Sequence, residues 1–233
     1  MQHRMKFEAF EKKIGVSFAD KDLLRQAFTH RSFINENRTG KSGHNERLEF
    51  LGDAVLELVI THFLYEKYPD GTEGDMTSYR AAMVNAVTLS GVAANLGMND
   101  LLLLSRGEAK DTGRARQYIL ANTYEAFVGA LYLDQGYDAA NDFIATSVFP
   151  LIDDIVAKKL WLDAKSFFQE QAQDRVGVTP SYDLLGETGP DHDKHFTIGV
   201  YLGRELVAQG VGKSKQEAEQ DAAGNALEAK QWR

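Results

Sequence analysis

The sequence predicts an all-α domain over residues 1–160, followed by a small α+β domain over residues 164–233 with the order α-β-β-β-α. Two observations support this division. Before residue 160 no segment alternates between apolar and polar residues as a strand would. After Trp161, three short alternating segments lie between two helical ones. At 233 residues and 43% hydrophobic content, the chain can form two modest domains with buried cores.

The first domain is expected to consist of helices separated by glycine-rich or polar turns. Residues 30–45 contain several Gly, Asn and Ser residues and are predicted to be a loop. The central helix should begin after Asn45, a candidate N-cap, and end near Tyr68, before Pro69. The other helices are expected at residues 7–14, 22–29, 76–96, 118–133 and 137–159.

The second domain is expected to begin and end with a helix. A helix at 164–173 and an alanine-rich helix at 215–230 flank the predicted strands. The three strands are expected at 181–186, 194–202 and 205–211. The linker, near residues 158–163, is short.

The composition indicates where in the cell the protein is expected, but it does not identify a binding partner. The chain has no cysteine, its N-terminus has no apolar signal core, and no apolar run reaches about 18 residues. We therefore expect a soluble, cytoplasmic protein that does not bind a membrane. The net charge is −8, with 18 basic and 23 acidic residues in 1–163 and 8 and 11 in 164–233. Any nucleic-acid binding must therefore depend on local basic clusters.

Three acids in the predicted central helix share one face. Glu46, Glu49 and Asp53 are spaced i, i+3 and i+7. Carboxylates without a cysteine or a histidine cluster suit Mg²⁺ or Mn²⁺ better than zinc. The alternative from spacing alone is a solvated acidic face near the positive end of a helix. A separate apolar stripe is expected to face the core: Leu48, Leu51, Val55, Leu58 and Val59.

The segment NERLEFLGDA, residues 45–54, resembles the signature of the bacterial ribonuclease III family of double-stranded-RNA endonucleases. The resemblance extends over nearly the whole chain and implies a nuclease domain followed by a double-stranded-RNA-binding domain. It also implies metal-assisted hydrolysis that leaves 5′-phosphate and 3′-hydroxyl ends with two-nucleotide 3′ overhangs. The implied substrates are ribosomal RNA precursors and messenger RNA hairpins, and the implied assembly is a homodimer.

The resemblance implies that two acids from each of two helices bind Mg²⁺, for which Mn²⁺ can substitute. The first pair corresponds to Glu49 and Asp53, and the second to Asn122 and Glu125. The family typically has Asp where Asn122 stands. Asn brings no negative charge and its NH₂ group is a donor, so cation binding and water activation should be weakened. The residue is either an engineered change that holds RNA uncut, which we favour, or a feature of a natural member with reduced activity.

The same resemblance implies catalytic roles for Glu46, Asp53, Glu73 and Glu125. Without it, Glu73 would be interpreted as an exposed loop acid, and Glu125 as part of a solvated helix face. Phe50 resembles the residue that inserts into the partner subunit, and an ordinary core phenylalanine is the alternative.

The resemblance also places RNA-binding residues at three points of the second domain. Proteins recognise A-form RNA through 2′-hydroxyls in minor grooves and phosphates between them. The family usually has a second lysine where Gln216 stands, so weaker and more salt-sensitive binding is expected. For the lysines alone, a solvated helix start is the alternative. The expected residues are Ser166, Gln169, Glu170 and Gln173 in the first helix, Pro190 and His192 in the loop, and Lys213, Lys215 and Gln216 at the last helix.

Two alternative functions remain open at this stage. The first is a non-cleaving double-stranded-RNA-binding protein of the same fold, which Asn122 would permit. The second, more distant, is a helical metal-dependent phosphohydrolase of small nucleotides with an appended RNA-binding domain.

Overall fold

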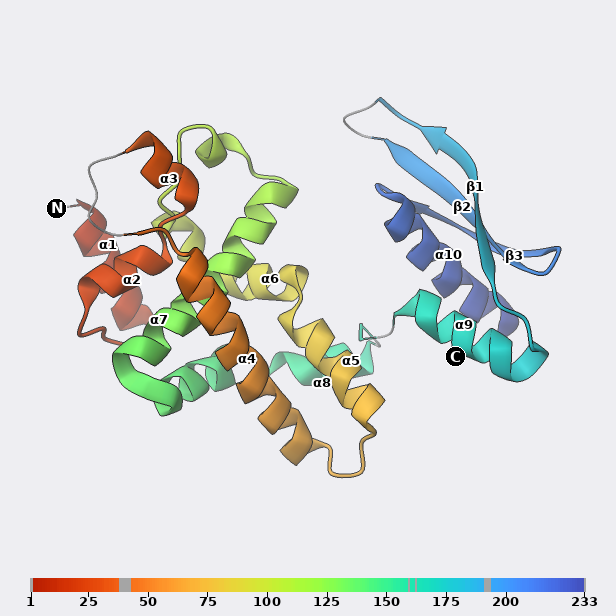
Figure 1. Cartoon of the computed structure of the whole chain (residues 1–233), viewed down its shortest axis with the longest axis horizontal. Helices are drawn as coiled ribbons and strands as arrows, with labels where there is room; N and C mark the ends of the chain where they lie inside the picture. The colour runs from red at the N-terminus through yellow and green to blue at the C-terminus, as the bar shows by residue number, and fades with distance from the viewer. Residues whose placement is uncertain (1, 38–42, 159, 162, 191–193, 233) are drawn as a thin grey trace. The chain divides into compact units, whose positions relative to one another are not determined.

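The computed structural model describes residues 2–37, 43–158, 160–161, 163–190 and 194–232. The chain forms two compact units, Met1–Trp161 and Leu162–Arg233 (Figure 1). The first unit is helical, and the second combines a three-stranded antiparallel sheet with two helices. The predicted fold classes are confirmed. Within the described part of the chain, no helix is both long enough and apolar enough to cross a bilayer.

The first unit is built around two long helices, α4 and α7, with shorter helices packed on them (Figure 1). The described elements are α1 (Gln2–Ile14), α2 (Lys21–Ala27), α3 (Arg31–Glu36), α4 (Glu46–Lys67), α5 (Glu73–Val84), α6 (Ala86–Leu96), the 3₁₀ helices η1 (Met98–Leu101) and η2 (Glu108–Lys110), α7 (Arg114–Ser147) and α8 (Leu151–Ala157).

Aromatic side chains join α1 and α2 to α7 in the core of the first unit. The ring of Phe28 meets Phe7 and Phe10 edge-on, with centroids 5.3 and 5.5 Å apart. Phe127 of α7 lies 5.7 Å from Phe10 in a similar arrangement. Edge-to-face contacts add to the stabilisation that these buried rings give through their area. The N-terminal helices therefore support the helix that carries Asn122 and Glu125.

The crossing of α4 and α7 depends on two glycines that face each other. A β-carbon on Gly52 would overlap with the carbonyl oxygen of Glu125 and would lie 2.8 Å from the backbone nitrogen of Gly129. A β-carbon on Gly129 would overlap with the carbonyl oxygen of Leu48. Only glycine allows the two backbones to approach this closely. The contact lies directly beside Asp53 and Glu125.

The segments at residues 30–45 and 76–96 differ from the expectation for the first unit. The predicted loop at residues 30–45 contains α3, which His30 caps by accepting a hydrogen bond from the Ser32 N–H at 3.3 Å. The expected single helix over 76–96 is divided at Asn85, whose extended backbone (φ −68°, ψ 160°) ends α5 and whose side chain caps α6. Both corrections come from local capping hydrogen bonds.

The prediction that Asn45 caps α4 is wrong. Asn45 precedes the helix but its side chain accepts no capping hydrogen bond, and its amide instead donates to the Ala27 carbonyl at 3.2 Å. It ties the start of α4 to the end of α2. α7 begins earlier than expected, at Arg114, and contains a non-helical residue, Gly136 (φ 84°, ψ −173°), in the gap between the helices expected at 118–133 and 137–159.

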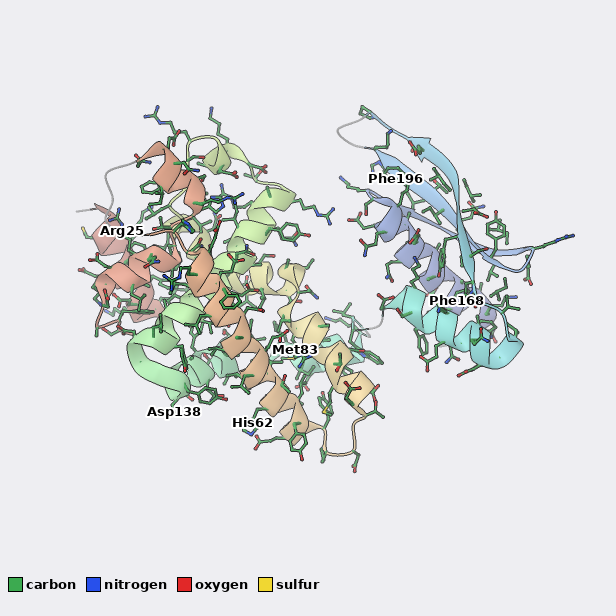
Figure 2. All side chains as sticks on the ribbon, in the orientation of Figure 1. Arg25, His62, Met83, Asp138, Phe168 and Phe196 are labelled. Carbon is green, nitrogen blue, oxygen red and sulfur yellow. The ribbon has the colours of Figure 1, made fainter. Side chains whose placement is uncertain are left out.

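In the second unit, two helices pack on one face of the sheet. The elements are α9 (Ala164–Val176), β1 (Ser181–Thr188), β2 (His195–Leu202), β3 (Glu205–Gly212) and α10 (Lys215–Lys230), with strand order β1-β2-β3. Phe168 of α9 is fully buried (Figure 2) against Val200 and the alanine face of α10. Gly210 of β3 lies against the backbone of Ala222, which brings α10 close to the sheet.

The glycine crossing makes a prediction about stability. Gly52→Ala should lower the free energy of unfolding of the first unit by about 3 kcal/mol or more, because a methyl group must displace the backbone of α7. Gly91→Ala in α6 is the matched control, since nothing lies within 4 Å of its β-carbon position. The control should be neutral or stabilising by about 1 kcal/mol.

Chemical denaturation followed by the fluorescence of Trp161, in a Trp232→Phe background, measures the first unit alone. Equal stabilities for the two variants would show that the α4–α7 crossing does not require glycine.

Candidate functional site

The crossing of α4 and α7 places four polar side chains of the predicted metal site near one another. Glu49 of α4 shares a side-chain hydrogen bond with Asn122 of α7. The charges of Glu49 and Asp53 act on Glu125, one turn further along α7. The structure therefore brings together the two pairs that the sequence placed on separate helices.

Burial and mutual repulsion change the acidity of two of these carboxyl groups. Burial, followed by the charges of Asp53, Glu49 and Glu57, raises the pKa of Glu125 to about 8. The pKa of Glu49 is also raised, first by burial and then by Glu46, while the hydrogen bond from Asn122 acts in the opposite direction. Carboxylates held this close are unfavourable without a compensating cation.

The donor set fits a hard divalent cation in chemistry, since it consists of carboxylate oxygens and one amide oxygen. In the described part of the chain, however, no group of three or more His, Cys, Asp or Glu side chains is arranged so that it could hold a metal ion. Asn122 occupies one of the four positions, which leaves three acids from two helices. Binding a cation therefore requires these side chains to move closer together.

A pocket of about 330 Å³ adjoins these residues on the side of α3. One acid of its wall, Glu46, lies 3.5 Å from the Arg31 guanidinium and 3.7 Å from His44 Nδ1. The pocket lining thus combines two acids, Glu46 and Glu49, with one arginine. Its lining residues are His30, Arg31, Asn45, Glu46, Glu49, Tyr118, Ile119 and Asn122.

Glu57 belongs to the same acidic face and the sequence analysis missed it. It lies four residues after Asp53 and is one of the charges that raise the pKa of Glu125. The i+4 spacing was a signal that could have identified it. Glu73, by contrast, is the exposed first residue of α5, in a helix start closed by a Thr72–Asp75 capping box. It is not among the charges that shift Glu49 or Glu125.

The outer face of α4 carries exposed apolar side chains. Phe50 is 82% exposed, so the interpretation of Phe50 as a core residue is wrong. Leu58, predicted to face the core, is 58% exposed, and Tyr65 is 70% exposed. With the exposed Ala54, these residues recur at helical spacing along one line, which we call the α4 stripe (Phe50, Ala54, Leu58 and Tyr65).

In the second unit, the predicted RNA-binding stripe of α9 lines a shallow pocket of about 340 Å³. Its residues are Ser166, Gln169, Glu170, Gln173 and Asp174. Pro190 is exposed after β1, and His192 lies outside the described residues. Lys213, Lys215 and Gln216 are exposed around Ser214, which caps α10 by accepting from the Glu217 N–H at 3.2 Å.

Comparison with known proteins gives a match to each unit. A family model described as "Ribonuclease-III-like" matches residues 20–152, and one described as "Double-stranded RNA binding motif" matches residues 164–230. The chain is 47% identical over 228 residues to ribonuclease 3 of a Geobacillus species, covering 97% of this chain and 92% of that protein. It is 45% identical over 224 residues to ribonuclease 3 of Bdellovibrio bacteriovorus, covering 96% and 95%.

A solved structure resembles the first unit. The nuclease domain of ribonuclease III from Campylobacter jejuni aligns with a TM-score of 0.54 and 39% identity, covering 60% of this chain and 96% of that domain. That structure was described for flexibility in a region involved in dimer formation.

The raised pKa of Glu125 predicts how stability changes with pH in the chain without added metal. The folded value of about 8 exceeds the unfolded value of 4.5, so folding favours the protonated carboxyl group. The contribution of Glu125 to stability should be greatest below the unfolded pKa and should be lost as the pH rises from about 5 to about 8. Glu125→Gln should lessen this loss, which melting temperatures measured across that range would test.

The matched control is Asp138→Asn, an exposed acid further along α7 (Figure 2). It should keep the wild-type pH dependence. A Glu125→Gln profile parallel to that of the wild type would contradict the assignment of this carboxyl group.

Proposed function

Because the chain belongs to the ribonuclease III family, we propose that this endoribonuclease uses Mg²⁺ to hydrolyse double-stranded RNA, leaving 5′-phosphate and 3′-hydroxyl ends with two-nucleotide 3′ overhangs. Mn²⁺ can substitute for Mg²⁺. The substrates are ribosomal RNA precursors and messenger RNA hairpins in the cytoplasm. The observation that carries the proposal is the α4–α7 crossing, which gathers Glu49, Asp53, Asn122 and Glu125.

Glu49, Asp53 and Glu125 would hold the cation, and Asn122 would contribute its amide oxygen weakly. When bound, the cation lowers the pKa of water and stabilises negative charge on the phosphate. Burial raises the pKa of Glu49 and Glu125, and the charges of neighbouring acids raise both further. Loading the site would relieve this repulsion, which is a physical reason for the acids to take up a divalent cation.

Asn122 should impair this site. It donates to Glu49, which favours the ionised form of that carboxylate, but it adds no negative charge of its own. A hard cation in such a site has one formal negative charge fewer than in a site with four acids. We therefore expect residual activity below that of a chain with Asp at this position.

The remaining predicted residues would position the RNA. Glu46, beside the pocket, and Glu73, at the start of α5, are proposed to contribute to cleavage. In the second unit, the α9 residues Ser166, Gln169, Glu170 and Gln173 can meet 2′-hydroxyls in a minor groove. Pro190 and His192 would enter the next minor groove, and Lys213, Lys215 and Gln216 would contact phosphates at the start of α10.

The α4 stripe supports the proposal of a homodimer. An exposed apolar line on a central helix, containing a phenylalanine that is 82% exposed, is typical of a protein interface. We propose that a second copy of the nuclease unit covers it, with Phe50 as the anchor. Each subunit would then supply one site and cut one strand.

Asn122 also favours a second candidate function, in which the protein grips double-stranded RNA without cutting it. The binding elements of the second unit do not depend on the acids of α4 and α7. In that case a labelled hairpin incubated with Mg²⁺ gives a retained complex and no fragments. Hydrolysis of small nucleotides would instead favour the phosphohydrolase alternative.

Replacing Asn122 by Asp distinguishes these functions. We expect Asn122→Asp to increase the rate of hairpin cleavage in Mg²⁺ by about tenfold or more, which corresponds to about 1.4 kcal/mol of barrier, because it restores a fourth charge. Single-turnover cleavage of a labelled hairpin is the measurement. Asn141→Asp, another polar position on α7, is a control for adding an acid to this helix. Equal rates for the unaltered chain and Asn122→Asp would contradict the proposed role.

The α4 stripe predicts the effect of removing its largest side chain. Phe50→Ala should weaken the dimer by about 2 kcal/mol or more, since a buried aromatic anchor commonly contributes this much. Sedimentation equilibrium measures the change. Leu133→Ala, which removes a leucine that is 56% exposed on α7, is the control and should leave the dimer unchanged. A Phe50→Ala dimer as stable as the control dimer would exclude Phe50 as the anchor.

A further inference from the structure

We propose that Arg31, with Tyr118 on the adjoining wall, binds a backbone phosphate of the RNA in the pocket beside the acids. This inference rests on the proposed function and adds a substrate contact made by the nuclease unit itself. Arg31 is the first residue of α3, and its side chain is 69% exposed. It lines the same pocket of about 330 Å³ as Glu49 and Asn122.

The position of Arg31 is unfavourable for cation binding alone. A guanidinium at the edge of an acidic pocket repels a divalent cation and lowers its affinity. Its ion pair with Glu46 is loose, at 3.5 Å, and both side chains are substantially exposed, so this pair contributes little to stability. A guanidinium beside the acids is favourable when an anion enters the pocket, because it attracts that anion. The planar fork of arginine matches the oxygens of a phosphate.

The backbone that carries Arg31 is held from both sides. The His30 N–H donates to the Leu103 carbonyl at 3.1 Å, and the Leu103 N–H donates to the Phe28 carbonyl at 2.9 Å. The Ser105 N–H donates to Ser32 Oγ at 3.1 Å. Figure 1 shows α3 beside the segment that carries η2. The backbone that carries the guanidinium is therefore ordered by hydrogen bonds. This reduces the loss of backbone entropy when Arg31 binds a phosphate.

Tyr118 completes the pocket from α7. It lies one turn before Asn122 and is 48% exposed. The Arg114 guanidinium lies 5.9 Å from the centre of its ring, which places a second cation near the same wall. A phenol hydroxyl can donate to a phosphate oxygen, and an exposed ring can pack against a ribose or a base. The pocket lining thus carries, beside its acids, two groups suited to an RNA backbone.

The test measures binding of the full-length chain to a short, fully paired RNA duplex as a function of salt. The buffer contains Ca²⁺, and gel electrophoresis verifies that the RNA stays intact. Arg31→Ala should weaken binding and should reduce the slope of log Kd against log salt by about one unit for each nuclease unit engaged. Arg31→Lys should keep the slope, because the charge remains, but should still lower kcat/KM for cleavage, because the fork is lost.

Arg25→Ala is the matched control, an exposed arginine on α2 that lines a different pocket (Figure 2). It should leave the affinity for the duplex and the slope of log Kd against log salt unchanged. An Arg31→Ala slope equal to that of Arg25→Ala would overturn the inference. A third variant, Arg31→Ala with Glu46→Gln, tests whether Arg31 only neutralises Glu46. Recovery of wild-type binding in this double variant would also overturn it.

The outcomes separate this inference from the proposed function. If the wild type and Asn122→Asp both fail to cleave the duplex in Mg²⁺, the nuclease proposal fails. The salt slope is still measurable in that case, and its reduction in Arg31→Ala would support a phosphate contact in a binding protein. If the unaltered chain cleaves the duplex and Arg31→Ala does not change the slope, the phosphate contact of Arg31 is excluded and the nuclease function is retained.

Discussion

The contact between Gly52 and Gly129 is the constraint on which the nuclease unit depends. Any side chain at either position would overlap with the backbone of the opposite helix. The contact lies beside Asp53 and Glu125, so the close approach of the two helices also brings the two pairs of polar side chains near each other. Acids on separate helices influence one another here because no side chain separates the backbones. Backbone packing and site chemistry are therefore one structural feature.

That feature has an electrostatic cost, which the elevated pKa of about 8 at Glu125 makes visible. Partly buried carboxyl groups that repel each other are unfavourable for folding at neutral pH, and proteins retain such arrangements mainly at functional sites. Asn122 brings no charge to the cluster and hydrogen-bonds Glu49, so we expect it to ease folding and to weaken the proposed cation binding. The expected result is that the empty site is more stable with Asn at position 122 than it would be with Asp.

The chain carries a net charge of −8, yet its second unit matches a double-stranded-RNA-binding motif. Local placement resolves this apparent conflict. Lys213 and Lys215 stand at the start of α10, and Arg31 stands at the wall of the acidic pocket. Solvent and salt screen the interaction between charges that are more than about 10 Å apart. A phosphate beside these residues would therefore respond to them more than to the net charge of the whole chain. The acids of α4 and α7 are proposed to serve a different purpose, the binding of a cation.

The sequence by itself determined the two fold classes, the α-β-β-β-α order and the placement of Glu46, Glu49 and Asp53 on one helix face, because each follows from short-range periodicity. The family signature identified Glu125 and the unusual Asn122. Only the tertiary structure decided the exposure of Phe50 and Leu58, the tie from Asn45 to Ala27, the division at Asn85 and the charge of Glu57 acting on Glu125. Burial, capping and charge coupling depend on which residues distant in sequence meet, and periodicity along one helix carries no information about its neighbours.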